Sequence, residues 1–267
     1  MASESVITSS NRIDQRFLHL RQTGRKALVC YATAGHPDRA RSIELLRGLE
    51  HAGADVVEVG VPFSDPLADG PVIQASSQVA LDGGMTFNGT LDLVAEAGLG
   101  VPVVLFGYLN PFLAAGSTCL KRIEKAGCDG VLITDLPVGA DPPLEARFAA
   151  SSLAFVRLVA PTTPVERMSL IARNGSGFVY LISRLGVTGM QQEVAPHLGA
   201  TVARLRSVTS LPICVGFGIT DARQAAAVAR VADGVVVGSA IVKAAGESVS
   251  AAIALTKSLR AGIDDAG

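Results

Sequence analysis

The sequence predicts a single α/β domain of the closed (β/α)8 barrel class, and three observations lead to that prediction. The chain has 267 residues, which matches the roughly 250 residues of one such barrel. A phrase made of a small-residue helix end, often an Asp, and four or five apolar residues recurs at 52–59, 126–133, 174–181 and 231–237. The 28 glycines and 13 prolines suit many tight turns between strands and helices.

Eight buried strands are expected from two sets of apolar runs. Four runs belong to the recurring phrase, and four more lie between its copies, at 27–33, 103–108, 154–159 and 213–215. Amphipathic helical segments separate the runs, for example at 39–51 and 202–208. Strands that are apolar throughout are typical of a parallel sheet covered by helices. An open doubly wound sheet is the alternative, although no Gly-x-Gly-x-x-Gly opens the first strand-to-helix turn.

An extra helix is predicted before the first strand. Residues 12–22 place Ile13, Phe17 and Leu20 on one helical face, and we expect this helix to close the bottom of the barrel. No linker interrupts the remaining sequence. Residues 1–267 are therefore expected to form one domain, with residues 1–11 as a disordered N-terminal tail.

Composition argues against several classes of partner and location. Lys and Arg number 23 against 24 Asp and Glu, and Trp is absent, so a nucleic-acid partner is not expected. The longest apolar stretch, 99–116, is broken by prolines and polar residues, and the N-terminus lacks the pattern of a signal peptide, so we expect a cytoplasmic protein with no membrane span. The 4 cysteines show no metal-ligand spacing and are expected to be buried thiols without a metal.

The apolar run around residue 58 contains an acidic residue. Side chains alternate along a strand, so Glu58 faces away from the side that carries Val57 and Val59. The valine side is expected to pack against helices, which turns Glu58 toward the mouth of the barrel, where barrel enzymes place their working residues. Burial raises the pKa of a carboxyl group, which suits proton transfer near neutral pH. The alternative is a structural Glu paired with a Lys or Arg.

The loop after this strand brings two more carboxylates over the predicted mouth. Residues 61–71 contain three prolines together with Asp65 and Asp69. A second carboxylate beside Glu58 would allow proton transfers between groups of different pKa. Either aspartate could instead cap a helix or hold the loop, and spacing alone does not choose between them.

The other half of the mouth has the pattern of an anion site. Glycine-rich turns follow the seventh and eighth predicted strands, as Gly216-Phe217-Gly218 and Gly238-Ser239. Backbone N–H groups at such turns and at a helix N-terminus bind phosphate, and (β/α)8 barrels often place phosphate there. The sixth strand contains Tyr180 and leads into residues 183–193, which are expected to form a mobile lid. Thr188 in that lid could bond a carboxylate or the phosphate.

Four segments of the chain resemble one known enzyme family. Residues 57–71, VEVGVPFSDPLADGP, closely resemble the hallmark loop of the tryptophan synthase alpha-subunit family. Residues 183–189, 216–219 and 238–242 are similar to later motifs of that family and occur in the same order. The resemblance extends from about Arg12 to Leu259 and implies a (β/α)8 barrel of the TIM type.

The resemblance implies a carbon-carbon lyase that cleaves indole-3-glycerol phosphate to indole and glyceraldehyde 3-phosphate without a cofactor or a metal. Glu58 would carry protons between a glycerol hydroxyl and indole C3. Asp69, rather than Asp65, would stabilise the positive charge that builds at the indole nitrogen, and Thr188 would hold Asp69 when the lid closes. The implied substrate-binding residues are Tyr180, Thr188, Gly189, Phe217, Gly218, Gly238 and Ser239.

The same resemblance implies a protein partner. Asp65, Pro66 and Asn110 fall where the family meets its beta chain, which carries pyridoxal phosphate and joins indole to serine. The implied assembly has two alpha and two beta chains and makes L-tryptophan. Two alternatives are a free-standing lyase that releases indole and a non-catalytic activator of a beta chain. The retained Glu58 and Asp69 argue against the second, because an unused buried carboxylate costs stability.

Some positions depart from the family's usual residues. His36 stands where the family commonly has Asp, and Thr134 where Pro is common. Gly139 lies in a stretch that is usually acidic, and Leu185 replaces a frequent Thr or Ala of the lid. None of these changes removes a proton-transfer group. They bear on communication between the lid and the beta chain.

Overall fold

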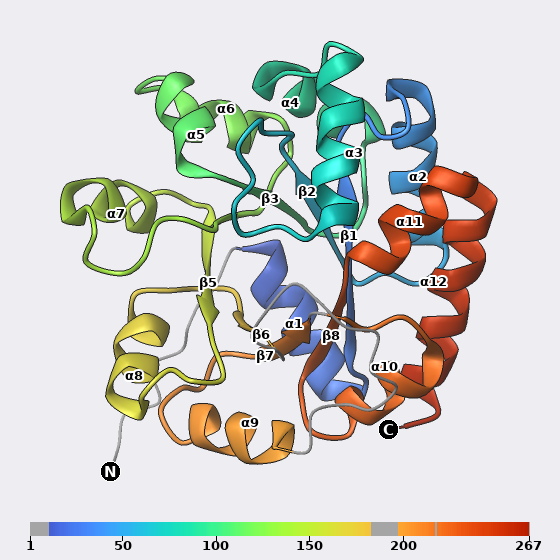
Figure 1. Ribbon diagram of the computed structural model, residues 1–267. Helices are drawn as coiled ribbons and strands as arrows, with labels where there is room; N and C mark the ends of the chain where they lie inside the picture. The colour runs from blue at the N-terminus through green and yellow to red at the C-terminus, as the bar shows by residue number, and fades with distance from the viewer. Residues whose placement is uncertain (1–10, 183–196, 217, 267) are drawn as a thin grey trace.

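Eight parallel strands form one closed barrel in the order β1 to β8, with helices around the outside (Figure 1). The computed structural model describes residues 11–182, 197–216 and 218–266. The strands are β1 (Ala27–Thr33), β2 (Val56–Gly60), β3 (Val103–Gly107), β4 (Gly130–Ile133), β5 (Ala154–Val159), β6 (Val179–Ile182), β7 (Ile213–Gly216) and β8 (Gly234–Val237). The predicted TIM barrel is confirmed.

One helix precedes the barrel, and the other helices of the described chain connect its strands or follow β8. They are α1 (Arg12–Gln22), α2 (Arg39–His51), α3 (Pro71–Asp82), α4 (Phe87–Ala97), α5 (Leu109–Ala114), α6 (Cys119–Lys125), α7 (Pro142–Ala149), α8 (Val165–Arg173), α9 (Leu198–Arg206), α10 (Ala222–Ala229), α11 (Ser239–Glu247) and α12 (Val249–Asp264). Two helices, rather than one, follow each of β2, β3 and β8. None of the helices described is long and apolar enough to span a membrane.

Side chains on each strand alternate between the barrel interior and the helical layer. On β2, Val57 and Val59 join the cluster that the helices cover, whereas Val56 joins the cluster inside the barrel. Glu58 therefore points inward, as the alternation predicts. The same alternation on β1 turns Val29 and Tyr31 inward, so the two neighbouring strands present their inner residues to one another.

Helix α1 closes the barrel end opposite the carboxyl ends of the strands. Ile13, Phe17 and Leu20 are buried in the interior cluster, and a side chain at Gly130 of β4 would come within 2.9 Å of Ile13. Asn11, which was expected to belong to a disordered tail, is instead the N-cap of α1. Its side-chain amide donates to the carbonyls of Asp129 and Ser152 at 2.8 and 2.9 Å.

The recurring phrase has a structural role at the start of the strands. Asp55 accepts the backbone N–H of Leu28 at 2.9 Å, Asp129 that of Val103 at 2.8 Å and Asp233 that of Ile213 at 2.8 Å. In the copy without an Asp, Ser176 accepts from Phe155 at 2.8 Å. Each side chain thus satisfies a backbone donor at the entry of the neighbouring odd-numbered strand, where the sheet itself supplies no partner. This role explains why the phrase repeats every second strand.

Candidate active site

Glu58 is a buried carboxyl group inside the mouth of the barrel. Its side chain enters from β2, and the residue is 1% exposed. Its Oε1 has no hydrogen-bond partner within the described part of the chain. Burial among apolar neighbours raises the pKa of Glu58 to about 8. At neutral pH the group is therefore protonated and able to donate a proton.

The loop between β2 and α3 carries Asp69, which is half-buried. The Asp69 N–H donates to the Pro66 carbonyl at 3.0 Å, and the Gln74 side chain donates to the Asp69 carbonyl at 2.9 Å. Burial raises the pKa of Asp69 to about 6, and a hydrogen bond with Tyr108 opposes that rise. Asp69 is thus ionised at neutral pH, where Glu58 is protonated. Two carboxyl groups with separated pKa values are typical of paired acid and base roles.

Asp65 lies in the same loop but in a different environment. It is exposed, and its Oδ2 accepts a hydrogen bond from Ser64 Oγ at 2.7 Å. The structure therefore separates the two aspartates that spacing alone left equivalent. Asp69 is held at the mouth, and Asp65 faces solvent.

All 3 tyrosines of the chain gather around these carboxyl groups. Tyr31 is on β1, Tyr180 is on β6 and Tyr108 follows β3. Burial raises the pKa of each tyrosine, and the negative charges of Asp69 and Glu58 add to the rise for Tyr31 and Tyr180. Sequence reasoning found only Tyr180. The available signal for the other two was their position at inward-facing strand ends.

Tyr108 holds the Asp69 loop from the neighbouring strand. Its hydroxyl accepts the Ala68 N–H at 3.0 Å and interacts with the Asp69 carboxylate, whose pKa it lowers. Its ring stacks on Phe63, with ring centroids 5.2 Å apart. The Thr134 hydroxyl donates to the carbonyl of Gly107, the residue before Tyr108, at 3.3 Å, so this departure from the family pattern adds a contact close to Tyr108. Tyr108 is a positioning residue for Asp69.

The predicted phosphate end has accessible backbone donors. Gly218 follows β7 with φ +80° and is exposed, and a side chain there would meet no atom within 4 Å. Gly238 precedes α11, whose first residue, Ser239, is also exposed. A helix N-terminus beside a glycine turn offers free N–H groups to an anion.

Some predicted residues lie outside the part of the chain that the structure describes. These are Thr188, Gly189 and Phe217, together with Leu185 and the rest of the expected lid. Of the predicted partner contacts, Asp65 and Asn110 are exposed and Pro66 is half-buried.

Partial burial lowers the pKa of His36, which keeps that side chain neutral at neutral pH.

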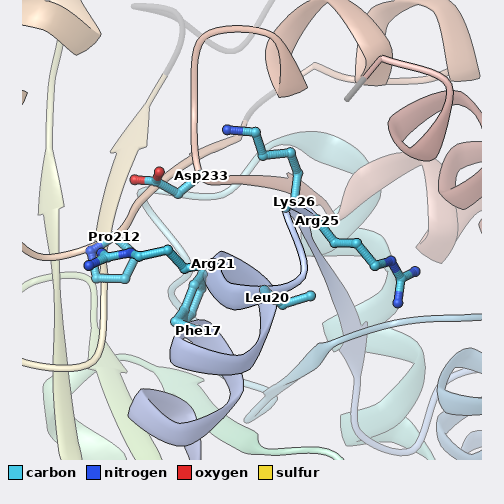
Figure 2. Close-up of a pocket in the computed structure, with 8 residues that line it drawn as sticks. Phe17, Leu20, Arg21, Arg25, Lys26, Pro212 and Asp233 are labelled. Atoms are coloured by element: carbon cyan, nitrogen blue, oxygen red, sulfur yellow. The ribbon is translucent and has the colours of Figure 1, made fainter.

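A separate cavity of about 140 Å³ lies at the opposite end of the barrel (Figure 2). Its lining residues Lys26, Pro212 and Asp233 directly precede β1, β7 and β8. Figure 2 shows the side chains of Arg25 and Lys26 pointing away from each other. Arg25 pairs with Asp264 at 3.4 Å, and Asp233 pairs with Arg206 at 2.6 Å. These two ion pairs join structural elements, since Asp264 lies on α12 and Arg206 on α9.

Comparison with known proteins shows the family to which the chain belongs. The family model described as tryptophan synthase alpha chain matches residues 17–264. The chain belongs to the tryptophan synthase alpha chain family. The alpha chain of Caulobacter sp. (strain K31) is 48% identical over 238 residues, which is 88% of this chain and 86% of that protein.

Two solved structures of this family have the same fold. The alpha subunit of Legionella pneumophila str. Paris superposes with a TM-score of 0.88 at 34% identity and covers 96% of this chain and 99% of its own. A tryptophan synthase of Mycobacterium tuberculosis gives a TM-score of 0.87 at 36% identity, with coverage of 95% and 98%. Members of the family cleave indole-3-glycerol phosphate to indole and glyceraldehyde 3-phosphate in tryptophan biosynthesis. The chain is therefore a carbon-carbon lyase, as its motifs predict.

Proposed function

We propose that this chain cleaves indole-3-glycerol phosphate at the barrel mouth, with Glu58 as the proton carrier and Asp69 as the charge stabiliser. The observation that carries the proposal is the unequal burial of these two carboxyl groups at the mouth, which raises the pKa of Glu58 to about 8 and that of Asp69 to about 6. Near pH 7 one group is an acid and the other is an anion. Those are the two forms that the reaction needs at its start.

The proton of Glu58 closes a cycle during the reaction. Glu58 first donates its proton to indole C3, and the positive charge that develops reaches the indole nitrogen, where the Asp69 carboxylate stabilises it. The Glu58 carboxylate then takes the proton from the hydroxyl on the adjacent carbon. The bond from that carbon to C3 breaks, an aldehyde forms, and the bonding electrons return to the ring. Glu58 ends protonated, and the protonated ring serves as the electron sink in place of a cofactor.

The remaining predicted residues would bind and orient the substrate. Gly218, Gly238 and Ser239 would hold the phosphate through backbone N–H groups, together with Gly189. Tyr180 and Phe217 would line the indole pocket. Thr188 would hold Asp69 in place.

A beta chain is the proposed protein partner. Leu67 is 94% exposed at the tip of the loop that carries Asp65 and Pro66, and Leu113 is 51% exposed on α5, the helix that carries Asn110. Exposed apolar side chains beside the mouth support a contact that covers them. The proposed assembly has two alpha and two beta chains, with pyridoxal phosphate in the beta chain only.

The 4 cysteines are buried free thiols, which suits a cytoplasmic location.

The test is the release of glyceraldehyde 3-phosphate from indole-3-glycerol phosphate, with the chain alone and with a tryptophan synthase beta chain. Slow cleavage that rises strongly with the beta chain is the expected result, because the partner couples to the active site. Fast cleavage that the partner leaves unchanged would identify a free-standing indole producer. No cleavage under either condition would refute the proposed function.

A further inference from the structure

Two of the buried polar groups at the mouth, neither of which has a short hydrogen bond among the described residues, belong to neighbouring strands. One is Glu58 Oε1, which the reaction uses. The other is the hydroxyl of Tyr31, a residue that is 7% exposed. Its partner is Thr33 Oγ1 at 3.5 Å, whereas O–H···O hydrogen bonds are commonly about 2.7–2.8 Å long.

The Thr33 hydroxyl is engaged elsewhere. Ser76 Oγ donates to the Ile73 carbonyl at 2.8 Å and lies 2.7 Å from Thr33 Oγ1. Because Ser76 uses its single proton on Ile73, the proton between Ser76 and Thr33 comes from Thr33. Thr33 then has no proton left for Tyr31. The Tyr31 hydroxyl can then only donate to Thr33 Oγ1, over a long distance of 3.5 Å, so a ligand oxygen at about 2.7–2.8 Å would be the better acceptor of its proton.

Tyr31 spans the distance between the two ends of the proposed site. It is in register with Glu58 on the neighbouring strand, and a side chain at Gly60, two residues further along β2, would collide with the Tyr31 hydroxyl. At its other end, the Tyr31 Cβ lies 3.5 Å from where a Cβ on Gly238 would be. The Tyr31 side chain thus extends from the predicted phosphate end, at Gly238, toward the end of the site where Glu58 lies.

The ring of Tyr31 is held in this orientation by packing. Phe106 of β3 meets it edge-on, with centroids 5.2 Å apart and an interplanar angle of 79°. Ile73 and Val242 form a buried cluster with it. The rigid hydroxyl thus lies at the Glu58 end of a side chain that extends from Gly238, and it faces the part of a substrate that follows the reacting bond toward the phosphate.

We propose that Tyr31 is a specificity-determining residue that donates a hydrogen bond to the glycerol chain of the substrate. This inference rests on the proposed function, in which Glu58 acts on the hydroxyl next to the indole ring. Tyr31 would bind the second hydroxyl, between the first and the phosphate. A site built to bond a substrate hydroxyl discriminates against a ligand that lacks it, because the buried partner is then left unpaired.

The experiment compares two ligands in the wild-type protein and in Tyr31→Phe. One is indole-3-glycerol phosphate, for which kcat and KM are measured. The other is 3-(indol-3-yl)propyl phosphate, which has the same ring, chain length and phosphate but no hydroxyls, and for which Kd is measured. We expect Tyr31→Phe to raise KM for the substrate about fivefold, with kcat and the Kd of the propyl phosphate changed by less than about twofold.

Three results would overturn the inference. An equal loss of affinity for both ligands would mean that Tyr31 acts only by packing. A fall in kcat with a shifted pH profile and an unchanged KM would assign the hydroxyl to proton transfer at Glu58. An unchanged KM with an unchanged kcat would leave the hydroxyl without a role.

A control variant tests the contacts between the hydroxyls of Tyr31, Thr33 and Ser76. Thr33→Val cuts the contact with Ser76 but leaves the Tyr31 hydroxyl in place, so it should not reproduce the selective loss for the substrate. If it does, the contact between Thr33 and Ser76 of α3 is responsible, and the inference is wrong. Failure of the wild-type protein to cleave the substrate or to bind the propyl phosphate would instead refute the proposed function itself.

Discussion

The carboxyl groups of Glu58 and Asp69, the acid pair, have different pKa values because they are buried to different extents. Glu58 is buried, and no cation among the described residues opposes the desolvation that raises its pKa to about 8. Asp69 is less enclosed and bonds Tyr108, which limits its pKa to about 6. The difference comes from the position of each residue, because Glu58 is part of a strand and Asp69 of a loop.

This pair predicts a bell-shaped pH dependence for kcat/KM of the free enzyme. Below about pH 6 Asp69 becomes protonated and no longer stabilises the charge at the indole nitrogen. Above about pH 8 Glu58 loses the proton that it must donate to C3. Activity should therefore fall on both sides of this range. A pH profile that stays flat from 5 to 9 would contradict the assignment of both groups.

The contact between Tyr108 and the Asp69 loop links two neighbouring connections of the barrel. Tyr108→Phe should move the acidic limb of the pH profile upward by roughly one unit, because it removes the hydrogen bond that lowers the pKa of Asp69. The ring and its stacking on Phe63 are kept, so the fold should remain. The pH profile of kcat/KM is the measurement, with the basic limb as the internal control. An acidic limb that does not move would show that Tyr108 does not act on Asp69.

The Asp residues before the strands should matter for stability and not for catalysis. Asp129→Ala removes the acceptor for the Val103 N–H and the ion pair with Arg12 at 3.2 Å. We expect a loss of about 1–3 kcal/mol in the free energy of unfolding, measured by denaturant titration, with kcat unchanged. Asp129→Asn keeps an acceptor and should lose less. Equal losses for the two variants would exclude the Val103 contact as the main contribution.

At the scale of the whole molecule, alternation and spacing predicted the barrel and the inward direction of Glu58. The phrase that contains Asp55, Asp129 and Asp233 marked strand entries, but its hydrogen bonds join residues that are separated by at least one helix and could not be predicted from spacing. Helix α9 begins at Leu198 and not near Val202, because Leu198 and Thr201 are also buried. The spacing of apolar residues in a segment does not determine at which residue its helix begins or ends.

The candidate site shows the same division. Position on a strand was enough to predict Glu58, and helix and turn patterns were enough to predict Gly218, Gly238 and Ser239 as candidates. The choice of Asp69 over Asp65 came from family resemblance, and its physical basis is the contact with Tyr108. Tyr31 and Tyr108 were missed because their roles depend on the path of other segments across the mouth. Such contacts exist only in the closed barrel.

The variant Glu58→Gln tests the proton-carrier role of Glu58 most directly. Its kcat for the cleavage of indole-3-glycerol phosphate is measured with a saturating beta chain. The substitution removes proton transfer but little volume, so phosphate binding and the fold should remain. General acid-base catalysis is commonly worth about 10²–10⁴-fold, and we predict a loss in that range. A variant that keeps more than about a tenth of the wild-type kcat would contradict the central role given to Glu58.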